Sequence, residues 1–563
     1  MSNIPKHVLT RRQFLKASAL TTLIATVGDK LSLTPTAVLT AGAAAPAVKE
    51  DTWVATACWM CRVGCGIRVH RVDGVIVKIE GNPECPENEG KLCARGNAAV
   101  MKLYNPYRVK APMKRTNPDK GPGVDPKWQE ISWDEAYNIV ADKLKKIRAE
   151  NPNKFMYTYG WGGGYSSGMA PFHTIFGSIN GMSGFGGMIC GAGMHTASYL
   201  MHGASSHTGD TDYQMYNIRG GASQGVNKAG VPETKDFVRA RERGMKFVAV
   251  DPRLSEEAAK ADEWVPIRPG SDRLMHLAMM NILLNELKIY DAEFIKRRTN
   301  GPYLIQPDGY YLRSKTDLVD DPIRKQKLGK PLVWDAKAKQ AKVFDDPSVI
   351  QNWNDLALEG ELEVEGTKVK PAFQIFKDHV KQFTPEMTEK VTTVPAATMR
   401  RLSKELAEAA QIGSSITING TVFPYRPVGS RWRGGRTHQH AAWDSLSNIL
   451  LFMLLGALDV PGGLIAEGAD LTPNPADGIT APKGSARYRF KWPPDAYMQD
   501  TWRPISYKNI SLAYSAILDP KKYGLEYPVE ALMIHGCNPL MGGGSVNKMV
   551  DAFKKIPFIF TIS

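Results

Sequence analysis

The sequence has little cysteine, and it has no apolar run long enough to cross a membrane. Five of its seven cysteines fall within the 36 residues from Cys58 to Cys93 of a 563-residue chain, which is not the even distribution of a small disulfide-bonded domain. Hydrophobic residues make up 43% of the chain and charged residues 23%. These features exclude wholesale disorder and a polytopic membrane protein, and they predict a globular protein of roughly three or four domains.

Before residue 425 the chain also lacks a run of basic residues interleaved with aromatic ones, the pattern expected of a nucleic-acid-binding surface. Lys and Arg outnumber Asp and Glu by 71 to 57, giving a net charge of +14, but the positive charges are scattered. We therefore expect no nucleic-acid partner. A solvated basic surface, an anionic membrane surface and an anionic substrate all remain compatible with this balance.

The N-terminus has the pattern of an export signal. Arg11-Arg12-Gln13-Phe14-Leu15-Lys16 precedes a short, weakly apolar stretch at 19–27 and a group of small residues at 41–45. Consecutive arginines in this order are typical of twin-arginine signals, whereas an ordinary basic amphipathic helix is the alternative. The pattern predicts that residues 1–44 are a signal peptide and that the protein is exported to the periplasm.

Strand and helix signals alternate along much of the remaining chain. Residues 66–72 and 75–79 read as strands joined by a turn at Asp73-Gly74. Ser132, followed by Glu135, forms a capping box that begins a helix. Buried strands are predicted at 155–159 and 247–250, and helices at 231–243 and 274–287. Alternating strands and helices predict a parallel, doubly wound α/β sheet.

The C-terminal half gives weaker signals. Further expectations are a polar, turn-rich insert at 301–375, a helix beginning at Pro395, a strand at 415–419, a long apolar helix at 441–458 and a final strand-like run at 556–563. Because a buried strand at a chain end usually has a following element to cover it, we expect the sequence to be truncated there.

Four of the clustered cysteines have the spacing of a metal site. Cys58-x2-Cys61-x3-Cys65-x27-Cys93 supplies four thiolates, which suit tetrahedral zinc and an iron-sulfur cluster equally well, while Cys85 lies outside the pattern. Together with Lys91-Leu92-Cys93-Ala94-Arg95-Gly96, the stretch resembles the N-terminal 4Fe-4S motif of molybdopterin oxidoreductases of the dimethyl sulfoxide reductase family.

The resemblance continues in order along the chain. The segments that carry it are Gln129–Ala136, Asp251-Pro252-Arg253, Ala261–Trp264, Ile267–Asp272, Val460–Gly463 and Gly536-Cys537-Asn538-Pro539. It implies a multidomain α/β fold, with a small β-rich iron-sulfur domain at 50–110 and doubly wound domains around the cofactor. The second domain would comprise 111–160 and 376–563, and the third 161–375.

The resemblance implies two molybdopterin guanine dinucleotides. A carboxylate can accept both donors of a guanine edge, a role that suits Asp251 and Asp272. Backbone N-H groups near glycines can bind pyrophosphate. The remaining cofactor-binding candidates are Gly220, Gly221, Ser223, Arg253, Gly270, Asn538 and Pro539, followed by a second glycine loop at 542–544.

Cys190 is the one thiol in the segment where relatives place the molybdenum ligand, although it could also be a buried filler. Gly191 follows it where formate dehydrogenases of the family have His, which argues against formate oxidation. Arg95, two residues after the last cluster ligand, matches the position of a basic residue between cluster and pterin and is expected to act electrostatically.

The expected reaction is a two-electron oxygen-atom transfer on a small, anionic substrate. Arg426, Arg431, Arg433 and Arg436 could clamp a sulfur or arsenic oxyanion, or they could contact cofactor phosphates or solvent.

The resemblance includes thiosulfate, polysulfide, tetrathionate and arsenate reductases. The partners it implies are a membrane subunit linked to quinone, together with a ferredoxin-like iron-sulfur subunit. Oxidation or hydroxylation of an organic substrate, a hydratase and an inactive truncated remnant remain as alternatives.

Overall fold

The computed structural model describes residues 50–562, apart from 62, 160–171, 173–175, 179, 184–190, 205, 223–229, 322–325, 433, 435–437, 439, 468–509, 524 and 543–544. Within the described part, no helix is both long enough and apolar enough to cross a bilayer. Residues 50–54 and Val69–Lys78 belong to one compact unit, and residues 55–68 and 79–562 belong to the other.

A three-stranded sheet opens the described chain. Strands β1 (Asp51–Ala57), β2 (Gly66–Val72) and β3 (Val75–Gly81) pair in that order. The expected turn between β2 and β3 is confirmed, because Asp73 and Gly74 both have positive φ (47° and 80°), as a two-residue hairpin turn requires. Two short helices follow, α2 (Ala94–Asn97) and α3 (Ala99–Leu103).

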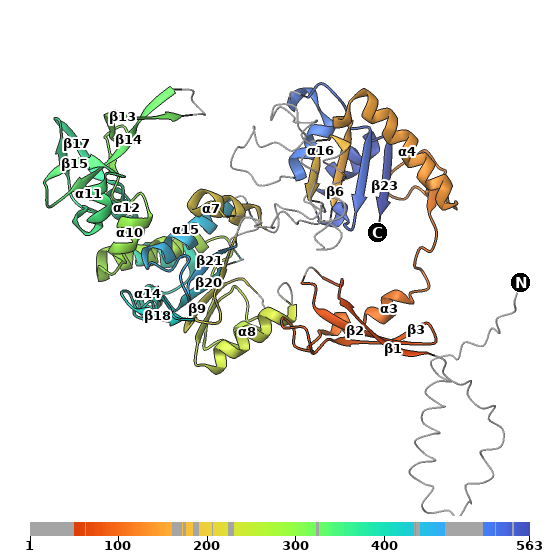
Figure 1. Ribbon diagram of the computed structural model, residues 1–563, viewed down its shortest axis with the longest axis horizontal. Coiled ribbons are helices and arrows are strands. Elements are labelled where there is room, and N and C mark those ends of the chain that lie inside the picture. Colours follow the sequence, from red (N-terminus) through yellow and green to blue (C-terminus); the bar gives the residue numbers. More distant parts are fainter. Residues whose placement is uncertain are drawn as a thin grey trace, which may run out of the picture. The chain divides into compact units, whose positions relative to one another are not determined.

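The first parallel sheet combines segments from both halves of the chain (Figure 1). Its order is β23 (Phe558–Ile562), β22 (Ala531–His535), β6 (Phe155–Tyr159) and β7 (Gly181–Ser183), with every neighbouring pair parallel. Phe155 and Tyr157 pack toward α4 (Trp133–Glu150), whereas Met156 packs toward α16 (Ile510–Leu518) and α18 (Val546–Lys555). Alternating side chains therefore bury both faces.

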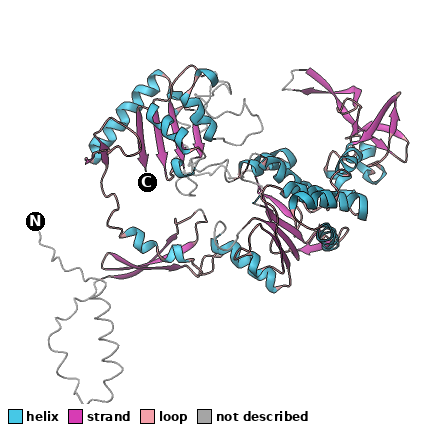
Figure 2. Ribbon diagram, turned by 180° about the vertical axis from the view of Figure 1, so that it is seen from behind, coloured by secondary structure: helices cyan, strands magenta, loops and turns pink. Residues whose placement is uncertain are grey.

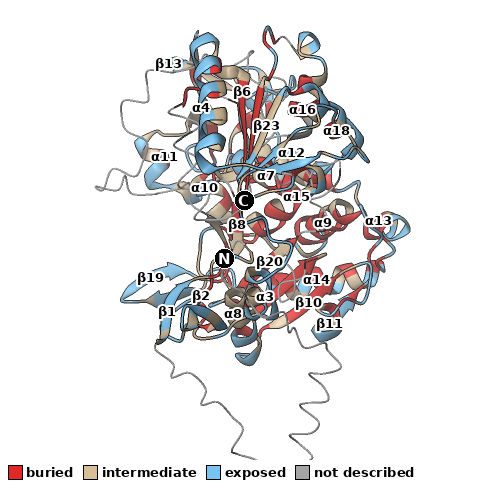
Figure 3. Ribbon diagram, turned by 90° about the vertical axis from the view of Figure 1, so that its right-hand side faces the viewer, coloured by how far each residue is buried: buried red, intermediate tan, exposed pale blue. Residues whose placement is uncertain are grey.

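Helix α4 begins where the capping box predicts. The side chain of Ser132 accepts a 3.0 Å hydrogen bond from the backbone N-H of Glu135. Leu144 and Ile147 of this helix are buried in the core, while most of its other face is exposed (Figure 3).

The second parallel sheet has the order β11 (Glu263–Val265), β10 (Lys246–Val250), β9 (Tyr216–Gly220) and β20 (Val428–Trp432). All three pairings are parallel. The helices associated with it are α7 (Ala192–His202), α8 (Gly230–Glu242), α9 (Asp272–Asn281), α14 (Ala396–Ala409) and α15 (Ala441–Leu454). Figure 2 shows helices lying beside the strands. The doubly wound α/β class expected from the sequence is thereby confirmed.

The division between the two α/β domains differs from the expected one. Residues from 376 onward were assigned to the second domain, yet β20 is hydrogen-bonded to β9, and α14 and α15 contribute Leu402 and Phe452 to the same core as Ile218 and Val248. Strand partners this far apart in sequence are chosen by tertiary packing, which local periodicity does not encode.

Several helix and strand ends also differ. The helix expected at 274–287 is α9, followed by a π-helical turn at Ile282–Leu287, and the apolar helix expected at 441–458 ends at Leu454. Among the described strands, β18 (Ser415–Ile418) pairs with β19 (Thr421–Pro424) alone, in a hairpin.

The polar insert forms small antiparallel sheets and short helices. Its elements are β12 (Leu304–Ile305), β13 (Arg313–Asp321), β14 (Gln326–Asp335), β15 (Gln340–Val343), α11 (Pro347–Gln351), β16 (Leu362–Val364), β17 (Thr367–Pro371) and the start of α12 (Ala372–Val380). Helix α10 (Ala292–Arg298) precedes the insert, and α13 (Pro385–Thr392) follows it. The remaining short elements are β4 (Met113–Arg115), β5 (Trp128–Glu130), β8 (Ser206–Gly209), β21 (Leu464–Glu467) and α17 (Pro539–Gly542).

Candidate cofactor-binding site

The four cysteines of the predicted cluster motif lie on short loops next to β1, β2 and α2. Cys58 follows β1 and Cys65 precedes β2, and the N-H of Cys58 donates a 2.8 Å hydrogen bond to the carbonyl of Cys65. Cys93 is the N-cap residue of α2. Burial raises the pKa of the Cys65 thiol, and the thiols of Cys61, Cys58 and Cys93 raise it further, so all four thiols lie within electrostatic range of one another.

The arrangement fits a cluster with one iron per thiolate. Cys58 and Cys65 are buried and none of the four is in a disulfide. In the part of the chain that the structure describes, no three His, Cys, Asp or Glu side chains converge closely enough to ligate one metal ion. A 4Fe-4S cluster takes one thiolate on each of its four irons, which these four free thiols can supply.

Arg95 acts on the pKa of one of the predicted cluster ligands. Burial raises the pKa of the Cys93 thiol, but hydrogen bonds from the N-H groups of Gly96 and Arg95 and from the Arg95 side chain outweigh burial, and the net shift is downward. The guanidinium group of Arg95 therefore stabilises the thiolate form of a predicted ligand.

Most predicted dinucleotide-binding residues lie at the carboxyl edge of the second parallel sheet. Gly220 ends β9 and Gly221 follows it, Asp251 follows β10, and Gly270 and Asp272 follow β11. Ligands of open α/β sheets bind outside the carboxyl ends of parallel strands. Gly221 and Gly270 have φ of 55° and 78°, a region that glycine adopts without strain.

Asp272 is the stronger of the two guanine-binding candidates. It is the first residue of α9 and is only 4% exposed, and its Oδ1 accepts a 2.7 Å hydrogen bond from Nε1 of Trp432 at the end of β20. Burial raises the pKa of this carboxyl group. A Cβ at Gly434 would stand 3.3 Å from Oδ1, so a side chain there would crowd the carboxylate. Asp272 is thus a buried hydrogen-bond acceptor with backbone close beside it.

Gly220 has a second role that its sequence context did not reveal. A Cβ at this position would lie 2.1 Å from Cε2 of Trp432. The glycine is therefore required by the indole ring that orients Asp272, in addition to any contact with a pyrophosphate.

The carboxylate of Asp251 accepts hydrogen bonds from residues of the turn that follows β10. Its Oδ1 accepts the N-H of Arg253 at 3.0 Å and its Oδ2 accepts the hydroxyl of Ser255 at 3.3 Å. The side chain of Arg253 is 69% exposed and lies 3.8 Å from Glu256. These contacts fix the loop after β10, and they favour Asp272 over Asp251 as the base-binding carboxylate.

Three further titratable side chains near Asp272 were missed by the sequence analysis. Asp444 on α15 is 2% exposed, its Oδ2 lies 2.7 Å from Nε2 of His438, and burial raises its pKa to about 6. Fully buried His276 stacks edge-on against Trp432, with ring centroids 4.2 Å apart. An aspartate inside an otherwise apolar helix was the available signal for Asp444.

Predicted cofactor-binding residues also lie at the carboxyl edge of the first parallel sheet. Strand β22 ends at His535, and Gly536, with φ of 62°, turns the chain into Cys537 and Asn538. Oδ1 of Asn538 accepts the N-H of Met541 at 3.3 Å, and Pro539 begins α17. The predicted residues Asn538 and Pro539 thus follow a parallel strand, as the candidates in the second sheet do.

Two of the four predicted oxyanion-binding arginines are engaged in ion pairs within the chain. Nη2 of Arg426 lies 2.6 Å from Oδ2 of Asp291, and both side chains are buried, while Arg431 pairs with Glu233. These pairs, formed with distant segments, do not support an oxyanion clamp at either position. Arg433 and Arg436 lie outside the described residues, as do Cys190, Ser223 and the predicted signal peptide.

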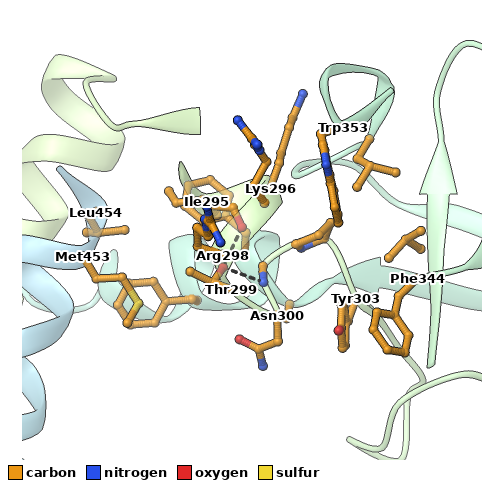
Figure 4. Close-up of a pocket in the computed structure, with 18 of the residues that line it drawn as sticks. Ile295, Lys296, Arg298, Thr299, Asn300, Tyr303, Phe344, Trp353, Met453 and Leu454 are labelled. Carbon is orange, nitrogen blue, oxygen red and sulfur yellow. Dashed lines mark hydrogen bonds between the residues drawn. The ribbon is translucent and has the colours of Figure 1, made fainter. Parts of the chain in front are cut away.

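A separate cavity of about 880 Å³ is lined by α10, α12, the insert and α15 (Figure 4). Tyr303, Phe344 and Trp353 line it together with Met453 and Leu454. Its lining contains none of the predicted site residues and no Cys, Asp or Glu.

Two family models match the chain in succession. The molybdopterin oxidoreductase Fe4S4 domain matches residues 51–105, and the molybdopterin oxidoreductase model matches residues 108–334. In fold, the chain is similar to acetylene hydratase from Pelobacter acetylenicus, with a TM-score of 0.61 and 18% identity over 90% of this chain and 60% of that one.

Curated relatives include components of three sulfur and arsenic enzymes. The sulfite dehydrogenase component from Allochromatium vinosum is 30% identical, over 74% of this chain and 43% of that protein. The molybdopterin-containing component of thiosulfate reductase from Salmonella typhimurium is 36% identical, over 45% and 32%. The molybdopterin-containing component of arsenate respiratory reductase from Shewanella sp. is 28% identical, over 81% and 46%.

The chain spans less than half the length of these relatives. Its two matched domains indicate a 4Fe-4S cluster and a molybdopterin cofactor, in agreement with the grouped cysteines and with the residues gathered at the sheet edges. The chain therefore belongs to the molybdopterin oxidoreductase family.

Proposed function

We propose that the protein catalyses two-electron oxygen-atom transfer on a small sulfur or arsenic oxyanion. The observation that carries this proposal is the similarity to proteins named for sulfite, thiosulfate and arsenate. When bound, the molybdenum cofactor supplies the redox chemistry, and the protein supplies orientation and electrostatics.

The described residues have distinct parts in this proposal. Asp272 accepts the donors of a guanine base, oriented by Trp432. The backbone after β9 and after β22 approaches the dinucleotides. Gly221 and Gly536 turn the chain there with positive φ, and neither has a side chain that would block the approach. Cys58, Cys61, Cys65 and Cys93 hold the 4Fe-4S cluster, and Arg95 stabilises the thiolate of Cys93. Cys190 is proposed as the molybdenum ligand.

A dye-linked assay of the full-length gene product tests the reaction. Reduced viologen is offered with thiosulfate, tetrathionate, polysulfide, arsenate or selenate, and an oxidised dye is offered with sulfite. We expect turnover with at least one of these anions. Activity with none of them, in protein that contains molybdenum, would overturn the oxyanion proposal in favour of an organic substrate.

The role of Cys190 is tested in the same preparation. Cys190→Ala should abolish turnover and leave the iron-sulfur EPR signal intact, because the two centres use separate ligands. Cys85→Ala is the matched control, since Cys85 lies outside the cluster motif, and it should retain both. Full activity of Cys190→Ala would refute the assignment.

Export and assembly complete the proposal. The Arg11-Arg12 pattern supports twin-arginine export to the periplasm, and two of the relatives are named as molybdopterin-containing subunits. The partners we propose are a quinone-linked membrane subunit, together with a ferredoxin-like iron-sulfur subunit. Replacing Arg11 and Arg12 with Lys should retain the precursor in the cytoplasm, as followed by cell fractionation, and unchanged export would refute the route.

A further inference from the structure

The cavity of about 880 Å³ lies between two separate apolar clusters of the described chain. On one side, Met453 and Leu454 of α15 belong to the core of the second parallel sheet. On the other side, Tyr303, Phe344 and Trp353 pack on the small core of the insert. Figure 4 shows these two groups of side chains facing each other across the cavity. A volume of this size is typical of pockets that take a small organic molecule.

The segment that leaves α10 lines the cavity and is fixed by hydrogen bonds. Oγ1 of Thr299 donates to the carbonyl of Ile295 at 2.7 Å and accepts the N-H of Gly301 at 2.9 Å. The N-H of Phe373, on α12, donates to the carbonyl of Gly301 at 2.9 Å. The lining is therefore held in place by the fold itself, as in a preformed ligand site.

Three consecutive basic residues supply the charge of the lining, which contains no Asp or Glu. Nζ of Lys296 donates to the carbonyl of Asn354 at 2.8 Å, and Nη1 of Arg297 donates to Oε1 of Glu293 at 2.8 Å. Arg298 is exposed, and among the described residues none forms a hydrogen bond or an ion pair with its guanidinium group. In the view of Figure 4 it lies between the two apolar sides. Arg298 is therefore the cation available to a ligand.

The cavity is distinct from the edge of the second sheet where the cofactor-binding candidates lie. Helix α15 contributes to both places, because Asp444 near its start interacts with Asp272 and Met453 near its end lines the cavity. At about 1.5 Å per residue, the helix separates these two residues by about 14 Å. A molecule in the cavity would therefore be additional to the dinucleotides.

We propose that this cavity binds an amphipathic organic anion, with its carboxylate or sulfonate on Arg298 and its apolar body between α15 and the aromatic side chains of the insert. The charge of the lining selects the anion, and the two apolar sides select a ligand with a hydrophobic body. The inference rests on the cavity alone. It can fail while the oxygen-atom transfer proposed above holds, and the reverse is equally true.

Two dyes of the same shape test the charge requirement. Anilinonaphthalene sulfonate carries one sulfonate, phenylnaphthylamine has the same aromatic body without it, and both become fluorescent in an apolar site. In titrations of the full-length, cofactor-loaded protein, we expect saturable binding of the sulfonate dye. Arg298→Met should weaken that binding by about tenfold or more, because a charge-assisted hydrogen bond is lost. The affinity for the neutral dye should be unchanged.

Arg297→Met is the matched control for Arg298→Met. It removes the same charge from the neighbouring residue, whose guanidinium group is already paired with Glu293. We expect a much smaller effect on the sulfonate dye. Equal losses in the two variants would show that general positive charge attracts the dye, and they would overturn the proposal. Absence of saturable binding, including the case in which another part of the full-length protein fills the cavity, would also overturn it.

Phe344→Ala tests the apolar side of the cavity. The loss of the ring should weaken the binding of both dyes, because each loses part of its apolar contact. Phe423→Ala is the control, since Phe423 is 37% exposed on β19 and does not line the cavity, and it should weaken neither. Unchanged affinities in Phe344→Ala would place the dyes elsewhere and refute the site. If Phe344→Ala does not fold, the comparison of Arg298→Met with Arg297→Met decides the proposal.

Discussion

Nε1 of Trp432 donates a 2.7 Å hydrogen bond to Oδ1 of Asp272, joining the last residue of β20 to the first residue of α9. The two residues are 160 positions apart in sequence. The bond determines how the buried carboxylate faces the carboxyl edge of the sheet. Its strength and its consequences can be measured separately from catalysis.

Trp432→Phe should destabilise the protein by about 1–3 kcal/mol, because Oδ1 of Asp272 would lose its donor inside the protein. The measurement is the free energy of unfolding from a denaturant titration. Trp264→Phe is the matched control, since Nε1 of Trp264 also donates a hydrogen bond, to the carbonyl of Asp251, but its side chain is 37% exposed. Equal losses in the two variants would contradict the importance of burial at Trp432.

Asp444 should make stability depend on pH. Burial raises its pKa to about 6 from the unfolded value of about 3.9. Because the pKa of Asp444 is higher in the folded than in the unfolded state, its protonation stabilises the folded state. This contribution is complete below the pKa of the unfolded state and is lost as the pH rises toward 6. The wild type should therefore lose stability relative to Asp444→Asn between about pH 4 and pH 6. A difference between the two that does not change over this range would refute the prediction.

His438 provides the internal check on that measurement. Its charge lowers the pKa of Asp444, opposing burial. In a His438→Gln background the pKa of Asp444 should rise further, so the pH range over which Asp444→Asn gains stability should extend upward. The same titrations compare the two backgrounds.

Arg426→Met should destabilise the fold by about 3–5 kcal/mol, because it leaves the carboxylate of Asp291 buried and without its ion-pair partner. Lys145→Met is the control, since Lys145 and Asp142 are 4.0 Å apart and about 80% exposed, and its effect should be within about 0.5 kcal/mol. Thermal or denaturant unfolding measures both. A stable Arg426→Met variant with an altered KM would instead restore Arg426 as a substrate-binding residue.

Cys93→Ser should lose the iron-sulfur EPR signal and most of the acid-labile sulfide, because the cluster would lack one of its four thiolates. Cys85→Ser should retain both. Cys85 belongs to the same loop region, but its thiol forms hydrogen bonds with the backbone of Asn88, Glu87 and Gly66, which lower its pKa. Loss of the cluster in Cys85→Ser would show that the ligand set has been assigned incorrectly.

Local patterns in the sequence were reliable where one short segment decides the structure. The spacing of Cys58, Cys61, Cys65 and Cys93 identified thiols that the structure places within electrostatic range of one another. The Ser132 capping box began α4, and Asp73-Gly74 formed the expected turn. In each case, the hydrogen bonds or ligands involved come from residues close in sequence, so the pattern carries the necessary information.

Other predictions required partners that the sequence does not place. The arginine cluster at 426–436 suggested a site for an anion, but Arg426 pairs with Asp291, which is 135 residues away in sequence. The boundary at 376 missed that β20 joins β9. Asp251 and Asp272 looked equivalent as candidate carboxylates, and only their surroundings separate a turn residue from a buried acceptor.

The sequence by itself therefore determined the iron-sulfur motif, the alternation of strands and helices, and the candidate residues that follow β9, β10 and β11 of the second parallel sheet. Only the tertiary structure decided which strands pair, which arginines are neutralised within the protein, and which aspartate is buried beneath Trp432. The reason is physical. Turns, caps and ligand spacings depend on a few neighbouring residues, whereas burial and charge pairing depend on chain segments that meet only when the whole sheet has formed.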